Sequence, residues 1–315
     1  MRSKNAIKAA LLFLFILFAV CNLFCGLGKG DGFIILRIRL PEVLAAVFAG
    51  FALGAAGAVS QIIFKNPLAD PYILGISSGS ALGISVCFLT GLYYLTGFSA
   101  VIGSALFGGI LSVFIIMGIR RIIRKQDHLS LLLSGIVYGY IAGALSSVIL
   151  SNIERDKIYS IVQWLFGTFS FYDIRLLIVF TAAAFGIFLF ILSRSATLDL
   201  MNFSDKKLQT LGIDPGKERT IFFIAVSVLV AMTVSVTGII GFVGLMAPHF
   251  ARVVTGSKSR ALLVLSGFIG ALLTLSAALI SRLFTAFYMP VGMVLSLLGG
   301  AYFIIFYRGR NGIKI

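Results

Sequence analysis

Long apolar stretches separated by short polar segments follow one another along the whole chain. A transmembrane helix needs about 20 predominantly apolar residues. Nine stretches come close to that length, and a tenth is long enough only for a half-span. The expected segments are 6–25, 43–63, 73–90, 99–119, 129–151, 175–193, 220–242, the half-span 241–252, 261–283 and 291–307. The pattern predicts an all-α polytopic membrane protein with about ten transmembrane helices, in a single transmembrane domain over residues 1–315.

Proline interrupts this pattern between the second and third segments. Asn66-Pro67 and Asp70-Pro71 follow an apolar helix that runs into Gln61 and Lys65, and a further apolar segment then resumes. Polar, irregular backbone at membrane depth is tolerated only where protein or a water-filled cavity covers it. The break is therefore part of a covered region or an ordinary cytoplasmic turn, and the pattern alone leaves both open.

A second break has similar spacing. Gly57 lies ten residues before Pro67, and Gly238 lies ten residues before Pro248. The two spans are five segments apart, so they would cross the membrane in opposite directions. Inverted repeats with broken helices at matching positions are typical of transporters. The spacing therefore predicts a weak inverted repeat.

Composition supports the membrane assignment. Of the 315 residues, 59% are hydrophobic and 12% are charged, whereas soluble domains carry roughly 25% charged residues. The chain has 26 Lys and Arg against 11 Asp and Glu. In a membrane protein such an excess collects in cytoplasmic loops, so it does not indicate a nucleic-acid partner. Placing the N-terminus in the cytoplasm puts 19 of the 26 basic residues inside. We therefore expect a multi-pass protein with both termini and the loop 194–219 in the cytoplasm.

The sequence offers little catalytic or metal-binding chemistry. It has two histidines and three cysteines, none in a metal-ligand spacing, and no phosphate-binding loop of the form G-x-x-x-x-G-K-[ST]. The predicted spans contain no pair of acidic residues that could carry protons or sodium ions. We expect no catalytic residue, metal or cofactor, so energy for any uphill transport would come from another chain.

Five motifs carry a resemblance to a known family. They are R-L-P (39–41), G-x-x-x-Q (57–61), N-P-L-A-D-P-x-x-L-G-I-S-S-G (66–79), G-F-V-G-L-x-x-P-H-x-x-R (241–252) and P-V-G (290–292). Weaker matches are L-L-L-S-G (131–135), W-L-F-G (164–167) and L-G-I (211–213). Over about residues 34–308 the chain resembles the FecCD-like permeases of ABC importers for iron-siderophore chelates, haem and cobalamin.

The resemblance implies a type II ABC importer permease fold in the cell membrane. The permease would pair with a second permease subunit, either another copy or a close relative. Two cytoplasmic ABC ATPase subunits would hydrolyse ATP, and an extracellular substrate-binding protein would deliver the substrate. The chain itself would not be an enzyme. A ferric-siderophore-type chelate is the leading substrate, and haem or cobalamin is the alternative.

The loop 194–219 is similar to the family's ATPase-coupling segment, which forms two short helices. Asp199, Asn202 and Ser204 could each cap a helix there, because short polar side chains satisfy free backbone N–H groups. The residues expected to contact the ATPase are Lys207, Leu208, Leu211 and Gly212. The alternative is a solvated linker with a run of charge.

Arginines at the outer face would meet carboxylates of the binding protein. The matching positions are Arg39 and Arg282. The family often has a second arginine after R-L-P, but this chain has Glu42, and Arg37 could substitute. Without the resemblance, Arg39 and Arg282 would be interpreted as interfacial anchors with snorkelling side chains.

The translocation path would follow the fifth and tenth segments, according to the resemblance. Its polar candidates on the fifth segment are Ser134, Tyr138, Ser146 and Ser147. Two other classes of protein are alternatives to the importer permease. A secondary transporter driven by an ion gradient predicts carboxylates within the spans, and an intramembrane enzyme needs a nucleophile or metal cluster.

Overall fold

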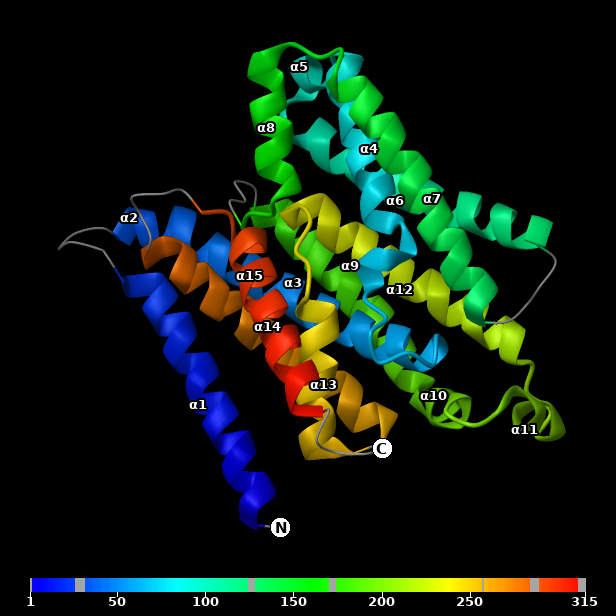
Figure 1. The fold of residues 1–315 in the computed structure, drawn as a ribbon. Coiled ribbons are helices and arrows are strands. Elements are labelled where there is room, and N and C mark those ends of the chain that lie inside the picture. The colour runs from blue at the N-terminus through cyan, green and yellow to red at the C-terminus, as the bar shows by residue number, and fades with distance from the viewer. Residues whose placement is uncertain are drawn as a thin grey trace.

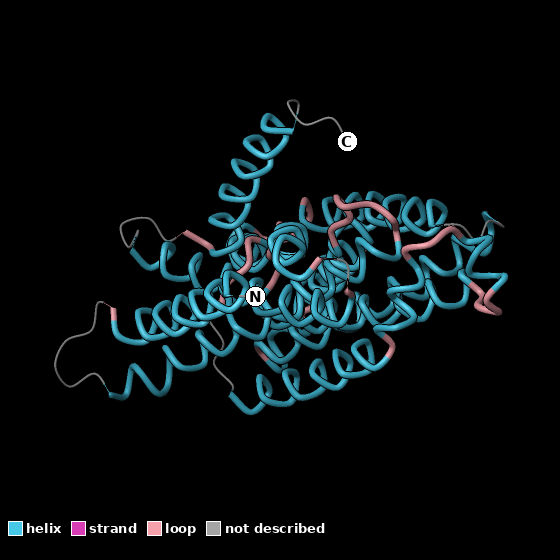
Figure 2. The backbone as a smooth tube through the Cα atoms, turned by 90° about the horizontal axis from the view of Figure 1, so that it is seen from below, coloured by secondary structure: helices cyan, strands magenta, loops and turns pink. Residues whose placement is uncertain are grey.

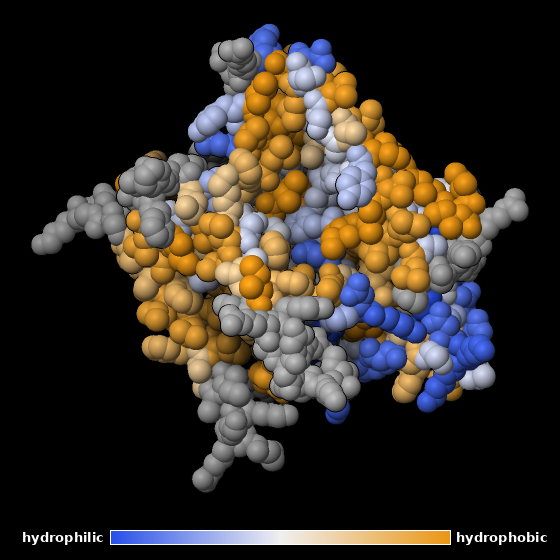
Figure 3. Space-filling model, viewed as in Figure 1, coloured by the Kyte–Doolittle hydropathy of each residue, from blue (hydrophilic) through white to orange (hydrophobic). Residues whose placement is uncertain are grey.

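The computed structural model describes residues 2–25, 32–123, 128–169, 174–256, 258–283 and 289–310. Its regular elements are all helical, and no strand occurs in these ranges (Figure 1). Figure 3 shows apolar side chains over most of the viewed face. Hydrophilic residues gather at the end with α10 (Ser195–Met201) and α11 (Asp205–Thr210), and at the end with α5 (Leu92–Thr96) and α8 (Arg155–Leu165). This distribution suits a bundle that crosses a bilayer.

Ten helices coincide with the ten predicted segments. They are α1 (Arg2–Phe24), α3 (Leu40–Ile63), α4 (Ile76–Leu89), α6 (Phe98–Ile123), α7 (His128–Leu150), α9 (Ile174–Ser193), α12 (Pro215–Thr237), α13 (Val243–Thr255), α14 (Ser259–Leu283) and α15 (Val291–Arg310). Among the described residues, six helical stretches are long and apolar enough to cross a membrane, and three shorter apolar helices accompany them. The predicted fold class is confirmed.

Several boundaries differ from the prediction. Helix α3 is preceded by α2 (Gly32–Ile34) and a π-helical turn, η1 (Ile35–Arg39), where a loop was expected. Helix α12 starts at Pro215, inside the predicted loop 194–219, and ends at Thr237 rather than 242. It ends there because Gly238 adopts a φ of 71°, which residues with a Cβ rarely adopt.

Helix α8 lies between the predicted segments 129–151 and 175–193, where no helix was expected. Its apolar residues recur at helical spacing, and they bury Ile161 and Trp164 against the bundle. The helix is too short and too polar to cross a membrane, so the pattern of long apolar stretches did not predict it. The recurrence of apolar residues every three to four positions is the sequence signal that indicates this helix.

Helix α3 forms the centre of the bundle. It packs against α14, α12 and α13, and nearly every residue from Pro41 to Ile63 is buried. A Cβ at Gly54 would lie 2.1 Å from the carbonyl oxygen of Ser266, on α14. Small residues thus let the two backbones approach closely, as is usual where helices pack in lipid.

Helix α15 extends away from the rest of the bundle in Figure 2. Its exposed apolar side chains include Leu297 and Ile304. In Figure 1 the C-terminal end of α15, the N-terminal end of α1, and helices α10 and α11 all lie towards the same side of the molecule. These helix ends and the two short helices thus share one side of the bundle.

Candidate functional site

The first break, between α3 and α4, is held by its own polar side chains. The Oδ1 atom of Asn66 accepts a hydrogen bond from the Leu68 N–H (2.9 Å), and the Oδ1 atom of Asp70 accepts one from the Tyr72 N–H (3.0 Å). Asp70 caps the short helix η2 (Pro71–Leu74) and is buried. The two side chains therefore stabilise local backbone, as such turn-forming residues commonly do.

The second break, between α12 and α13, packs directly against the first. The Ile240 N–H donates a hydrogen bond to the Tyr72 hydroxyl (3.2 Å). A Cβ at Gly244 would lie 2.6 Å from Cδ of Pro71. Phe242 holds a φ of 67°, an uncommon conformation for a large aromatic residue. Two segments that are far apart in the sequence therefore form one junction inside the bundle.

A glutamine and an arginine connect the helices that flank these breaks. The Oε1 atom of Gln61 accepts a hydrogen bond from Nη1 of Arg252, and Nε2 of Gln61 donates to the Leu245 carbonyl (3.3 Å). At Gly57, a Cβ would lie 1.9 Å from the Gly244 carbonyl oxygen. The polar ends of the G-x-x-x-Q and P-H-x-x-R motifs thus meet, a pairing that sequence reasoning missed although both motifs were recognised.

Two further motifs reach the same junction. The Thr168 N–H, which follows the W-L-F-G motif, donates to the Thr237 carbonyl (2.8 Å). At Gly292 of the P-V-G motif, a Cβ would lie 2.2 Å from the Phe166 carbonyl oxygen and 2.7 Å from that of Ile239. We call this convergence of 57–75, 164–168, 237–252 and 290–292 the motif junction.

The Gly–Pro spacing does not mark equivalent positions in the two breaks. Gly57 lies within α3 and Pro67 follows that helix, whereas Gly238 follows α12 and Pro248 lies inside α13. The spacing was therefore a poor marker of an inverted repeat. Both glycines allow close packing, since a Cβ at Gly238 would lie 2.1 Å from the Trp164 carbonyl oxygen, but Gly238 in addition holds a positive φ of 71°.

The loop 194–219 forms the predicted pair of short helices, α10 and α11. Gly212 follows the second helix with a φ of 75°, and Pro215 begins α12. Leu211 is 55% exposed, and Lys207 is exposed with its Nζ 4.1 Å from the centre of the Phe203 ring. These residues and Gly212 are available at the surface.

Leu208 differs from its neighbours because its side chain is completely buried. It therefore offers no surface to a partner in this conformation. This burial differs from the expectation that Leu208 contacts the ATPase directly.

The capping residues of this loop also differ from the prediction. Asp199 accepts a hydrogen bond from the Ser259 N–H (2.7 Å), so it caps α14 across the structure rather than a neighbouring helix. Asn202 lies at the C-terminal end of α10, and Ser204 precedes α11 without a side-chain capping bond. The capping role at the start of α12 belongs to Asp214, which accepts from Gly216 and Lys217.

Ion pairs hold the hairpin of α10 and α11 to the bundle. Asp205 pairs with Arg219 (2.6 Å) and with Lys65 (2.9 Å). Hydrogen bonding from Arg219, with a further contribution from Lys65, lowers the pKa of Asp205 to about 2. Arg194 and Glu218 form a second pair at 2.6 Å. The loop is thus a structured part of the protein and not a solvated linker.

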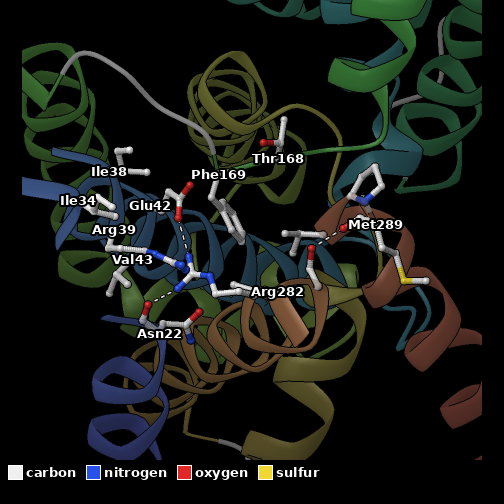
Figure 4. Close-up of a pocket in the computed structure, with 14 residues that line it drawn as sticks. Asn22, Ile34, Ile38, Arg39, Glu42, Val43, Thr168, Phe169, Arg282 and Met289 are labelled. Atoms are coloured by element: carbon white, nitrogen blue, oxygen red, sulfur yellow. Dashed lines mark hydrogen bonds and ion pairs between the residues drawn. The ribbon is translucent and has the colours of Figure 1, made fainter. Parts of the chain in front are cut away.

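At the N-terminal end of α3, Arg39 and Arg282 line one cavity of about 410 Å³ (Figure 4). Arg282 is not a free cation, because its Nη2 pairs with Oε2 of Glu42 at 2.5 Å and its Nη1 donates to the Asn22 carbonyl. Arg39 is half-buried on the same wall. The residue that replaces the family's second arginine therefore neutralises another arginine of the expected docking pair.

The four path candidates on α7 do not share an environment. Ser134 and Ser146 are buried and donate to carbonyl oxygens one turn earlier, and the buried Tyr138 hydroxyl lies 3.0 Å from Oγ of Ser112. Only Ser147 among the four is exposed. In this conformation Ser134, Tyr138 and Ser146 are packed between helices, so they do not face an open path.

Comparisons with known proteins identify the family of this chain. The model of the FecCD transport family matches residues 7–309. An iron chelatin transport system permease protein of Helicobacter pylori is 36% identical over 280 residues, covering 88% of this chain and 83% of its own. The Fe(3+)-citrate import system permease protein of Bacillus subtilis is 33% identical, with coverages of 91% and 85%.

A solved structure has a similar fold. A protein described as a metal-chelate type ABC transporter in an inward-facing conformation superposes with a TM-score of 0.86 at 27% identity. The match covers 97% of this chain and 99% of the other. With a family model and close relatives that span almost its whole length, the chain belongs to the FecCD transport family.

Proposed function

We propose that this chain is the membrane-spanning permease of an ABC importer that carries a ferric-siderophore-type chelate into the cell. The observation that carries the proposal is the full-length similarity to permeases named for iron chelates and ferric citrate. The motif junction supports it, since the residues that carry the resemblance meet where two helices break inside the bundle. Covered irregular backbone of this kind is expected where a transporter opens and closes.

ATP hydrolysis in two partner subunits would act on the hairpin of α10 and α11. Lys207, Leu211 and Gly212 are the surface residues we assign to that contact, and the buried Leu208 positions them. In this arrangement the hairpin faces the cytoplasm, and both termini lie on that side.

An extracellular binding protein would dock over the cavity at the N-terminal end of α3, which Arg39 and Arg282 line. Arg39 would receive a carboxylate there, while Arg282 would have to exchange its bond with Glu42. A second permease subunit, the same chain or a relative, would cover the exposed apolar side chains of α15. The path between the two subunits would then include the α7 surface that holds Ser147.

Uptake into proteoliposomes tests this function. The permease is reconstituted with its cognate ATPase and binding protein, and radiolabelled ferric citrate, hydroxamate and catecholate chelates, haemin and cobalamin are compared. We expect ATP-dependent uptake of a ferric chelate. Uptake of haemin or cobalamin alone would change the substrate and keep the class. Uptake that survives loss of the ATPase phosphate-loop lysine and collapses with an ionophore would instead indicate a secondary transporter.

A further inference from the structure

Asp205 joins three parts of the molecule through one carboxylate. Its Oδ1 atom accepts from Nη2 of Arg219 at 2.6 Å and from Nζ of Lys65 at 2.9 Å. The same Lys65 ammonium donates to the Phe203 carbonyl at 2.8 Å. Asp205 begins α11, Arg219 lies in α12, and Lys65 follows α3, so the contacts tie the hairpin to two central helices.

The two cations have different surroundings. The Arg219 side chain is 1% exposed, whereas that of Lys65 is 27% exposed. A buried guanidinium needs its carboxylate partner, so the pair of Asp205 and Arg219 holds α11 in place. The Lys65 contact is not required for that purpose. It adds a separate connection from the hairpin to the first break.

Lys65 is well placed to pass on a movement. Its backbone has a φ of 50°, unusual for a lysine, and its N–H is bonded to the Ile62 carbonyl at 3.1 Å. The next residue, Asn66, bonds back to the Gln61 carbonyl at 3.2 Å. The side chain that reaches Asp205 is thus attached to backbone that cannot shift without moving the break.

The break in turn contacts the motif junction. Gln61 is bonded to Arg252 and Leu245 of α13, and Tyr72 is bonded to Ile240 between α12 and α13. A continuous set of hydrogen bonds and ion pairs therefore runs from α11 through Lys65 to both broken segments. Such a set can carry energetic coupling between distant sites when it joins an element that has two discrete arrangements.

We propose that Asp205 and Lys65 are positioning residues that pass movement of the α10–α11 hairpin to the motif junction. The inference rests on the proposed function, because it takes the ATPase to act on the hairpin. It assigns the transmission to one ion pair, separate from the contacts that hold the ATPase and from those that fold the hairpin.

Lys65→Met separates this role from folding. Methionine has a side chain of similar length to lysine, and the pair of Asp205 with Arg219 is unchanged. The variant removes only the contacts of the Lys65 ammonium with the hairpin. We expect the variant to retain the ATPase on co-purification and to hydrolyse ATP. Chelate uptake per ATP hydrolysed should fall by about tenfold, within the usual range of coupling between sites. Lys65→Arg should restore the ratio. Lys157→Met, which removes a similar pair with Glu154, is the matched control and should leave it unchanged.

A second measurement needs no substrate. Leu68, in the first break, is 43% exposed. With Cys21, Cys25 and Cys87 replaced by serine, Leu68→Cys reports on the break through its rate of maleimide labelling. We expect ATP to change that rate when Lys65 is present and not when Lys65→Met is added. Equal responses in both backgrounds, unchanged uptake per ATP, or loss of the ATPase from Lys65→Met would overturn the proposal. Absence of uptake from the wild-type complex would contradict the proposed function and would leave this labelling comparison valid.

Discussion

Single glycines and polar side chains decide how closely the central helices approach. Gly57 lies in the middle of α3, where only a hydrogen fits against the Gly244 carbonyl. Gln61, one turn later, provides both a donor and an acceptor to α13. The G-x-x-x-Q motif therefore has a physical explanation: its glycine allows the close approach, and its glutamine supplies the hydrogen bonds to α13.

Gly57→Ala should destabilise the protein by about 1–3 kcal/mol, the usual result of forcing a methyl group into a packed interior. Gly118→Ala is the matched control, because Gly118 lies in α6 with nothing within 4 Å of its Cβ position. That change should be neutral or stabilising by about 0.5–1 kcal/mol, since alanine is the better helix former. Unfolding of the detergent-purified variants measures both. Equal stability for the two would contradict the close contact assigned to Gly57.

Glu42→Gln should strengthen docking of the binding protein. The Glu42 carboxylate neutralises Arg282, so its removal frees a cation for a partner carboxylate. We expect affinity to rise by about two- to fivefold, in keeping with a partly exposed ion pair, and the gain to shrink at high salt. Binding to reconstituted permease at two salt concentrations checks this. Glu154→Gln removes an exposed carboxylate elsewhere and serves as the control. Weaker binding by Glu42→Gln would show that the pair is needed to shape the docking surface.

The short helices α10 and α11 have one side that packs against the protein and one side that is exposed. The hairpin of α10 and α11 is held by the buried Leu208, by the pair of Asp205 with Arg219, and by Asp199 at the start of α14. Its outer surface carries Leu211 and Lys207. One element thus has a structural face and a free face, and substitutions on the two should have different effects.

Leu211→Asp should reduce co-purification of the ATPase without lowering the stability of the isolated permease. Leu208→Ala should do the reverse, because truncating a buried leucine costs about 2–5 kcal/mol. Co-purification and thermal unfolding, measured on the same preparations, distinguish these outcomes. A large stability loss from Leu211→Asp would place that side chain in the core instead.

Acid should weaken the hairpin through Asp205. Its pKa of about 2 in the folded protein lies below the ordinary value of 3.8, so the ionised form is favoured by folding. The stabilisation is complete above the ordinary value and is lost as the pH falls towards 2. Thermal unfolding of the wild type should therefore show a fall in stability between pH 4 and pH 2 that is smaller in Asp205→Asn. An identical acid profile in both proteins would exclude this contribution.

The whole molecule has one strongly buried region and one helix that stands apart. Helices α3 and α12 are covered on almost all sides, whereas α15 projects from the bundle with apolar side chains exposed (Figure 2). In lipid such a surface is stable on its own, but close helix packing also favours association. A second subunit along α15 would complete the bundle and enclose a path.

Leu297→Cys should allow two copies to be joined in membranes. In a background without native cysteines, a short bismaleimide should convert this variant to a cross-linked dimer, since Leu297 is 67% exposed on α15. Leu189→Cys is the control, because Leu189 is 46% exposed on α9. Equal cross-linking at both positions would indicate random collision and would count against a specific interface at α15.

Sequence reasoning located all ten long or half-span helices and the two short helices of the coupling hairpin. It missed α8, whose amphipathic period is short and polar, and it misjudged Leu208, which lies one turn from the exposed Leu211. It also treated Arg282 as a docking residue without its internal partner. Helix α8 was missed as an element, whereas Leu208 and Arg282 were misjudged because tertiary packing decides which side of a helix faces the protein.

By itself the sequence determined that the chain crosses a membrane, where its helices begin and end to within a few residues, and which family it joins. Those properties are local, because apolar length and internal hydrogen bonding decide a membrane helix. Only the tertiary structure decided that Gln61 meets Arg252, that Glu42 neutralises Arg282, and that Asp205 joins Lys65. These pairs form between residues 140 to 240 positions apart, where helix packing and not sequence spacing brings the side chains together.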